Sequence, residues 1–128
     1  MSTRCPCGTG LPLDECCGRY LSGAASTAPT AEALMRSRYT AFVLGDVDHL
    51  LATWHPDTRP PALELDGDVR WLGLDVLDVV AGGLLAAEGE VEFRASYVVD
   101  GVRGAQHERS RFTRVGGRWH YLDGVAAG

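Results

Sequence analysis

The residues of this sequence with the clearest chemistry are its four cysteines, which all lie between positions 5 and 17 of the 128-residue chain. Cys5 and Cys7 are separated by one residue, and the adjacent pair Cys16 and Cys17 follows after eight more. Four thiolates match the tetrahedral all-sulfur site of structural zinc, and iron shares this geometry and the preference for soft ligands. The sequence therefore predicts one bound metal ion, zinc with iron as the competitor, over the alternatives of unligated thiols or a redox pair.

The charge of the chain narrows the classes of partner. There are 12 Lys and Arg residues against 17 Asp and Glu, which gives a net charge of -5 and disfavours binding to nucleic acid or an anionic membrane. The first residues lack the apolar segment of a secretory signal, and the longest uncharged apolar stretch, 79–87, is too short to span a bilayer. We therefore expect a cytoplasmic protein without a membrane partner. In that reducing compartment, clustered cysteines favour a metal over disulfides.

The composition changes after the cysteines. Residues 23–30, GAASTAPT, are small and polar and contain a proline, which is typical of a linker. We therefore expect two domains, a metal knuckle over residues 1–24 and a larger domain over 25–128. Because so short a loop has no core of its own, the metal would replace one. Metal removal is then expected to disorder the first two dozen residues and to leave the remainder folded.

Two helices are predicted after the linker. Thr30 is suited to be the N-cap of a helix that runs to about residue 44, where Gly45 ends it. Arg38 lies within the apolar stripe of this helix, which places a charge on the side that faces the core. Asp46 begins a second, shorter helix, which we expect to end at His55, before a proline. Two consecutive helices of this kind form a hairpin.

The second half of the chain has the texture of strands. Residues 71–79, 90–99, 108–115 and 118–122 are rich in β-branched and aromatic side chains in alternation. Asp100-Gly101 and Gly116-Gly117 are typical of hairpin turns. Helices followed by an antiparallel meander predict an α+β fold. Alternation predicts that Phe93, Ala95, Tyr97, Glu108, Ser110 and Phe112 face the helices, and that Arg94, Ser96, Arg109 and Arg111 face outward.

A buried ion pair between helix and sheet follows from this pattern. Arg38 and Glu108 both lie on faces that must point at the same core, and an unpaired buried charge would be destabilising by about 3–5 kcal/mol. We therefore predict a direct Arg38–Glu108 ion pair, with Asp123 as the next candidate partner of Arg38. The pair has two interpretations, an architectural one and a catalytic one.

Several further side chains are candidates for a pocket or for proton transfer. His55 beside Asp57 has the position of a general acid or base, although a histidine at a helix end also favours the helix dipole. His49 and His107 are expected to be exposed, and His120 is expected on the sheet surface. The candidate pocket residues are Arg38, Tyr39, Trp54, His55, Trp71, Tyr97, Glu108, Ser110, Trp119 and Tyr121.

The cysteine segment and several later segments carry a family resemblance. CPCGTG followed by CCG resembles the SEC-C motif, a small metal knuckle. The segments LMRSRYTAF, TWHP, WLGL, ERSRF and GRWHYLDG are similar, in order and spacing, to the YchJ family of bacterial proteins. The resemblance implies an amino-terminal SEC-C knuckle followed by a nuclear-transport-factor-two-like (NTF2-like) α+β domain, a cone formed by a curved sheet and helices. It implies no established activity.

The chain departs from the family pattern in two places. SEC-C knuckles usually carry lysines and an aromatic residue between the cysteine pairs, whereas residues 11–15 here are LPLDE, which weakens an expectation of docking on acidic partners. Many family members also have a second knuckle at the carboxyl end, and this sequence has no further cysteine.

Two classes of function remain. The first is a binding or adaptor protein, in which the knuckle and the open end of the cone recognise a protein partner or a small-molecule ligand. The second is an enzyme of the isomerase, dehydratase or hydrolase type, in which Glu108, His55 or Tyr39 moves protons inside the cone, an inference by analogy of fold. The sequence has no nucleophile and base motif, so we favour the binding module.

Overall fold

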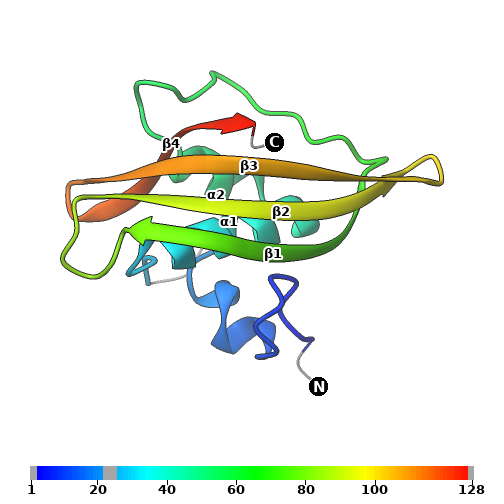
Figure 1. Cartoon of the computed structure of the whole chain (residues 1–128), viewed down its shortest axis with the longest axis horizontal. Helices are drawn as coiled ribbons and strands as arrows, with labels where there is room; N and C mark the ends of the chain where they lie inside the picture. Colours follow the sequence, from blue (N-terminus) through cyan, green and yellow to red (C-terminus); the bar gives the residue numbers. More distant parts are fainter. Residues whose placement is uncertain (1–2, 22–25, 127–128) are drawn as a thin grey trace.

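The computed structural model describes residues 3–21 and 26–126. Two short 3-10 turns in the cysteine segment precede two helices, and four strands complete the chain (Figure 1). The elements are η1 (Leu13–Glu15), η2 (Cys17–Arg19), α1 (Ala31–Leu44), α2 (Val47–Ala52), β1 (Arg70–Ala81), β2 (Glu88–Val99), β3 (Val102–Val115) and β4 (Arg118–Ala126).

The four strands form one antiparallel meander in the order β1-β2-β3-β4. Asp100 and Gly101 both have positive φ, 51° and 77°, at the β2–β3 connection, and two glycines with positive φ, 60° and 82°, form the β3–β4 turn. Positive φ at both central residues gives the turn twist that matches antiparallel strands. The predicted hairpin turns are therefore confirmed, and they fix the register of the sheet.

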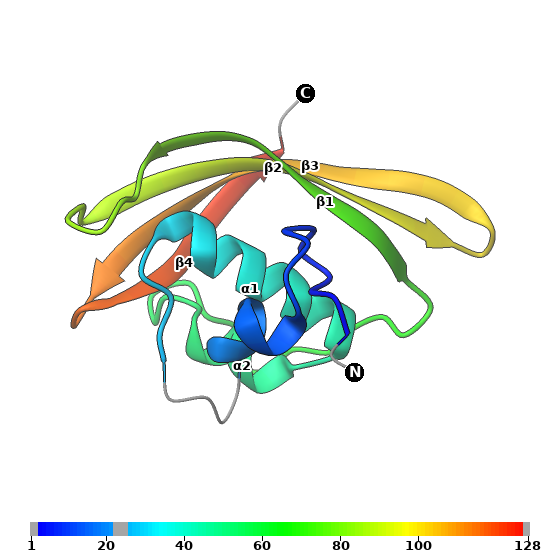
Figure 2. The same cartoon turned by 90° about the horizontal axis from the view of Figure 1, so that it is seen from below.

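The sheet is strongly curved, and both helices lie against its concave side (Figure 2). The β1–β2 pairing has register shifts after Trp71 and Val76, and the β3–β4 pairing has one at Arg111. Such irregularities bend a strand and increase its twist. Helices on the inner face of a curved antiparallel sheet give the α+β arrangement that the sequence predicts.

The first helix forms as its caps dictate. The Thr30 side chain accepts a hydrogen bond from the Ala33 N–H at 3.0 Å, and Gly45 ends the helix with φ 77°. The second helix ends at Ala52, earlier than the expected His55. The reason is a competing partner: the Tyr121 N–H donates to the Thr53 carbonyl at 2.7 Å, and the His55 N–H donates to the Tyr121 carbonyl at 2.8 Å. The chain after α2 therefore pairs with β4.

The core lies between α1 and the concave face of the sheet. The predicted inward residues Phe93, Ala95, Ser110 and Phe112 are all buried. Arg94 and Arg111 are exposed, and Arg109 pairs with Asp78 and Glu92 on the outer face, so the predicted alternation is confirmed. The core cluster comprises Cys5, Cys7, Cys16, Cys17, Ala28, Ala31, Leu34, Met35, Tyr39, Leu74, Val91, Phe93, Ala95, Phe112 and Trp119.

Two histidines are less exposed than the sequence suggests. His49, predicted to be on the surface, is only 5% exposed, because its ring turns from α2 toward α1 and its Nε2 lies 3.0 Å from Ser37 Oγ. His107 is partly buried, because its Nε2 lies 2.7 Å from Glu92 Oε2 across the β2–β3 pair. In both cases a polar partner on a neighbouring element holds the ring against the protein.

Candidate functional site

The four cysteines form one compact cluster. Their sulfur atoms all lie within 4.8 Å of one another, and all four residues are buried. The sulfurs of Cys7 and Cys16 are 3.6 Å apart. Four sulfurs bound tetrahedrally to zinc at about 2.3 Å lie about 3.8 Å from one another. The donor set and its spacing therefore fit a tetrahedral metal ion.

The backbone of the knuckle brings the two cysteine pairs together. Arg4 and Pro12 form a bridge, and the Cys5 N–H donates to the Leu11 carbonyl at 2.8 Å, so the chain folds back on itself after Cys7. Gly8 makes that reversal with φ 89°. The turns η1 and η2 then deliver Cys16 and Cys17, and a side chain at Gly18 would collide with the Leu13 carbonyl.

The protonation of the cluster depends on its neighbours. Hydrogen bonds from the other thiols, Cys17 first, lower the pKa of Cys7 to about 4. The bond to ionised Cys7, followed by burial, raises the pKa of Cys17, and burial raises that of Cys16. The Cys7 thiolate thus forms readily, whereas those of Cys16 and Cys17 form only with a compensating cation. Metal binding would displace these protons.

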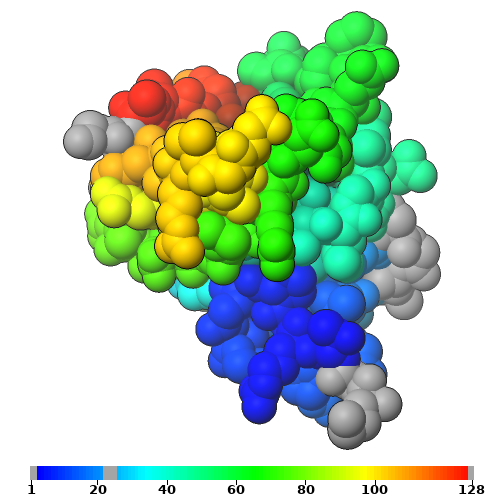
Figure 3. Space-filling view, turned by 90° about the vertical axis from the view of Figure 1, so that its right-hand side faces the viewer, coloured from blue at the N-terminus to red at the C-terminus, as the bar shows by residue number. Residues whose placement is uncertain are grey.

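The knuckle is attached to α1. The Arg36 guanidinium donates from Nη1 to the Cys7 carbonyl at 2.9 Å, and the Cys5 sulfur lies 3.6 Å from Thr40 Oγ1. Figure 3 shows the segment as a lobe below the rest of the molecule. The domain boundary expected after residue 24 lies outside the described residues and stays a prediction.

A cavity of about 170 Å³ lies between α1 and the concave face of the sheet. We call it the Arg38 cavity. It brings together Arg38, Tyr39, Trp54, Trp71, Glu108, Ser110 and Tyr121 from the predicted pocket residues, with Met35, Phe42, Phe93, Ala95 and Gln106.

Arg38 is 4% exposed, and its hydrogen bonds go to the end of α2 rather than to a carboxylate of the sheet. Its Nη1 donates to the Leu50 carbonyl and to Thr53 Oγ1, both at 2.8 Å. The guanidinium also lies over two rings, 5.1 Å from the centroid of Trp54 and 4.6 Å from that of Tyr121. Burial lowers the pKa of Arg38 to about 10, so the group is charged at neutral pH.

The predicted direct Arg38–Glu108 ion pair is wrong. No ion pair in the described part of the chain joins the two side chains; instead, Glu108 accepts from Ser110 Oγ at 2.5 Å and from Gln106 Nε2 at 3.4 Å. Asp123, the fallback partner, binds Arg111 on the outer face. The carbonyl and hydroxyl oxygens near the end of α2 and the two ring faces supply the negative potential that the prediction assigned to Glu108.

Three predicted pocket residues lie away from the Arg38 cavity. Tyr97 packs over Gly104 of β3 and against Trp71 at 5.7 Å between ring centroids. The Nδ1 of His55 accepts from the Asp57 N–H at 3.0 Å, next to the half-buried His120. The Trp119 indole donates to the Pro29 carbonyl at 3.2 Å.

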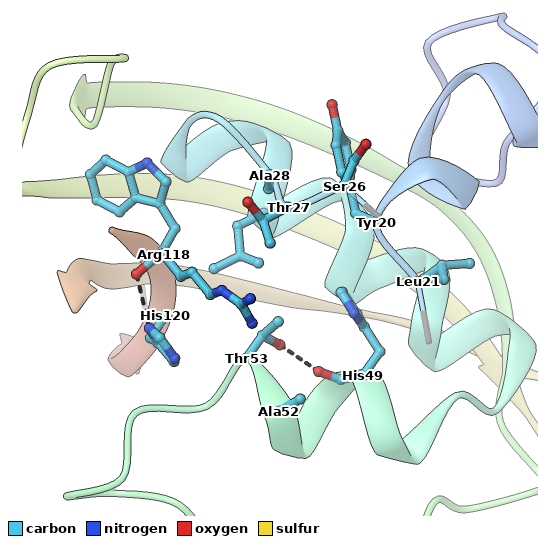
Figure 4. A pocket seen from close by; sticks show the side chains of 12 residues that line it. Tyr20, Leu21, Ser26, Thr27, Ala28, His49, Ala52, Thr53, Arg118 and His120 are labelled. Atoms are coloured by element: carbon cyan, nitrogen blue, oxygen red, sulfur yellow. Dashed lines mark hydrogen bonds between the residues drawn. The ribbon is translucent and has the colours of Figure 1, made fainter. Parts of the chain in front are cut away.

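Trp119 and His120 belong to a second pocket of about 210 Å³, shown in Figure 4. Arg118 extends across it toward α2, where Thr53 Oγ1 donates to the His49 carbonyl at 2.7 Å. Leu21 and Ser26, which also line it, flank residues outside the described part of the chain. We therefore assign this pocket no function.

Two features of the Arg38 cavity were missed at the sequence level. Gln106 shares the strand face of Glu108 and Ser110, so the period of two would have included it. Gly124 lies beside Glu108, and a methyl group there would overlap the carboxylate. In the sequence, this packing is indicated only by a glycine within a predicted strand, which often marks a position where another group lies close to the backbone.

Among the described residues, no helix is long and apolar enough to span a membrane.

Comparison with known proteins places the fold and the family. The profile of the YchJ middle NTF2-like domain matches residues 30–124. A UPF0225 protein of Chromobacterium violaceum is 57% identical over 126 residues, which cover 96% of this chain and 93% of the relative. A UPF0225 protein of Streptomyces coelicolor is 56% identical over 120 residues, which cover 94% of this chain and 93% of the relative.

Two solved structures of SEC-C motif-containing proteins are also similar. The solution structure from Rhodopseudomonas palustris has a TM-score of 0.83 at 35% identity, covering 98% of this chain and all of that one. The crystal structure from Psychrobacter arcticus has a TM-score of 0.77 at 29% identity, covering 98% of this chain and 84% of that one. The predicted NTF2-like α+β fold with an amino-terminal cysteine cluster is thereby confirmed, and the chain belongs to the YchJ family of UPF0225 proteins.

Proposed function

We propose that this protein binds one zinc ion through Cys5, Cys7, Cys16 and Cys17, and that the ion is structural. The observation that carries the proposal is the meeting of four buried sulfurs within 4.8 Å. A bound dication would reduce the repulsion between the thiolates. Four protein sulfurs complete a tetrahedral shell and leave no position for water or substrate, which is the mark of a structural site.

Metal analysis tests this proposal. A reduced preparation of the full chain is expected to contain about one equivalent of zinc, and less than about half an equivalent of any transition metal would contradict it. Iron in the same shell would absorb visible light, which zinc does not, so an absorption spectrum separates the two ions. Cys16→Ser is expected to lose the metal, whereas Asp14→Ser, an exposed neighbour, is expected to keep it.

We further propose that the protein acts as a cytoplasmic binding module rather than as an enzyme. A reducing cytoplasm would keep the four free thiols available to a metal. None of the four histidines lines the Arg38 cavity. Ser110 is only 1% exposed, so its hydroxyl is poorly placed to attack a substrate. The burial of Ser110 and the lack of a histidine beside it support recognition over nucleophilic chemistry.

The knuckle projects from the rest of the molecule (Figure 3), which favours a role as a docking surface for a protein partner. Affinity capture from the cytosol of the source bacterium tests this role with three chains: wild type, Cys16→Ser and Glu15→Ser. A partner that needs the folded knuckle is retained by wild type and by Glu15→Ser and is lost with Cys16→Ser. The same set of captured proteins with all three chains would contradict the role of the knuckle.

A further inference from the structure

The Arg38 cavity has the size of one aromatic ring. Its volume is about 170 Å³, and an apolar protein cavity of about 150 Å³ is large enough to bind benzene. Its walls include the rings of Tyr39, Phe42, Trp54, Trp71 and Phe93. A flat, mostly apolar ligand would therefore find ring faces and edges on several sides.

The cavity contains polar hydrogens without acceptors. Of the Arg38 nitrogens, only Nη1 has a hydrogen-bond partner among the described residues, which leaves Nε and Nη2. Trp54 Nε1 is fully buried and also lacks a partner within that part of the chain. An unpaired N–H as deeply buried as that of Trp54 is uncommon in folded proteins. A ligand with a carbonyl oxygen would supply an acceptor to Arg38 Nε or Nη2.

The same cavity contains a charged acceptor. The carboxylate of Glu108 receives hydrogen bonds from Ser110 and Gln106, and a carboxylate has room for further donors. Glu108 and Arg38 carry opposite charges and do not form a direct ion pair. Burial and the Glu108 carboxylate raise the pKa of Tyr121, which lies under Arg38, to about 12, so this phenol is neutral at pH 7. The formal charges of the cavity wall therefore sum to zero.

We propose that the Arg38 cavity binds a small, planar, uncharged ligand that presents a carbonyl acceptor beside an N–H donor, that is, an aromatic amide or lactam. The carbonyl accepts from Arg38, and the N–H donates to Glu108. A carboxylate ligand would add a second negative charge near Glu108, and an amidinium would add a second positive charge near Arg38. In a site of reduced dielectric, either like-charge pair is unfavourable. This site is independent of the proposed zinc ion.

Three probes of nearly the same shape test the proposal on the metal-loaded, full-length protein: benzamide, benzoate and benzamidine. They differ in charge, which is zero, negative and positive. Benzamide is expected to bind at least about tenfold more tightly than either charged probe in a calorimetric or nuclear magnetic resonance titration. Failure of benzamide to bind at millimolar concentration, or tighter binding of either charged probe, would overturn the proposal.

Charge-changing variants then locate the probe. Glu108→Gln leaves a net positive cavity and is expected to shift the preference to benzoate, whereas Arg38→Gln is expected to shift it to benzamidine. Glu15→Gln, an exposed change in the knuckle, is the control and should preserve the order of the wild type. If the order of affinity is unchanged in Glu108→Gln, the probes do not contact this carboxylate, and the proposed binding site is refuted.

The indole resonances give a readout that does not depend on the Arg38 variant folding. The N–H of Trp54 has no partner and should move strongly when benzamide binds, whereas that of Trp119, which donates to Pro29, should move little. A benzamide titration that leaves the Trp54 resonance in place would contradict the assignment, even if the probe binds elsewhere.

Discussion

The knuckle and the sheet domain are folded by different forces. Within residues 3–21 the only buried residues are the four cysteines, and the regular structure is one bridge and two 3-10 turns. The sheet domain instead buries large apolar side chains, with Leu34, Leu50, Val91 and Phe112 almost completely covered. The order of the first region is thus expected to depend on the four sulfurs and the proposed ion, whereas that of the second rests on the hydrophobic effect.

The two regions nevertheless pack against each other at α1. The cysteines belong to the same buried cluster as Leu34, Met35 and Tyr39 of α1. The helix that closes the Arg38 cavity is therefore also the surface on which the knuckle rests. Removal of the metal is therefore expected to disorder the knuckle alone, whereas damage to the sheet core is expected to destabilise the whole chain.

The largest effect is expected from Cys7→Ser, which removes a proposed metal ligand that is 0% exposed. Structural zinc sites contribute about 10–16 kcal/mol of binding free energy to the segment they fold. Hydrogen exchange of the knuckle amides should therefore become fast, while the amides of β2 and β3 stay protected. A collapse of the far-ultraviolet circular dichroism of the whole chain would contradict this and would make the knuckle part of the domain core.

Phe112→Ala should produce the opposite pattern. This residue is 2% exposed, and its ring lies 5.9 Å from that of Tyr121. Truncation of a buried aromatic side chain destabilises a protein by about 3–5 kcal/mol. Urea unfolding should show this loss for the whole domain, while the folded fraction still holds one metal ion. Leu72→Ala, at a 47% exposed position, is the control and should change stability by less than about 0.5 kcal/mol.

His49 makes the junction of α1 and α2 sensitive to pH. Burial lowers its pKa from 6.5 to about 4, and the positive charge of Arg38 adds to this effect. Between these two pH values His49 is protonated in the unfolded chain and neutral in the folded chain. The free energy of unfolding is therefore highest above about pH 6.5 and falls as the pH drops from 6.5 to 4. The loss is about 3 kcal/mol at pH 4.

The variant His49→Gln tests this linkage, since an amide can still donate to Ser37. Urea unfolding from pH 7 to pH 4 should show a shallower loss of stability in the variant than in the wild type. The control is Leu72→Ala, a 47% exposed position without a titratable group, which should keep the slope of the wild type. Because all three chains carry the same knuckle, acid release of a metal cancels from the comparison. Equal slopes in His49→Gln and wild type would contradict the role of His49.

The sequence was most informative where a signal is local. The Thr30 and Gly45 caps of α1, the Asp100-Gly101 turn and the alternation along β2 and β3 each depend on a few neighbouring residues, and each was predicted correctly. The grouping of four cysteines could likewise be predicted from spacing alone. The identity of the metal could not, because zinc and iron share the same shell.

The sequence could not predict which groups the buried polar side chains contact. The faces of Arg38 and Glu108 were predicted correctly, since both line one cavity. The pairing was wrong because a guanidinium can also donate to carbonyl oxygens and pack over aromatic rings. His49 was misplaced for a related reason. Its position in a six-residue helix gives little indication of which side packs, and the contact with Ser37 comes from the neighbouring helix.

The smallest expected effect concerns the link between the two regions. Arg36 on α1 donates from Nη1 to the Cys7 carbonyl at 2.9 Å and from Nε to Glu32 at 3.0 Å. Because this guanidinium is partly exposed, its loss in Arg36→Met should weaken the attachment of the knuckle by only about 1 kcal/mol. That energy corresponds to about fivefold faster exchange of the knuckle amides, with the metal content and the unfolding of the sheet domain almost unchanged.

Arg103→Met, at an exposed arginine of β3, is the control and should leave knuckle exchange as it is. Loss of the metal in Arg36→Met would instead show that α1 shapes the sulfur cluster itself, and the division between a knuckle ordered by its ion and a domain ordered by its core would fail at this contact.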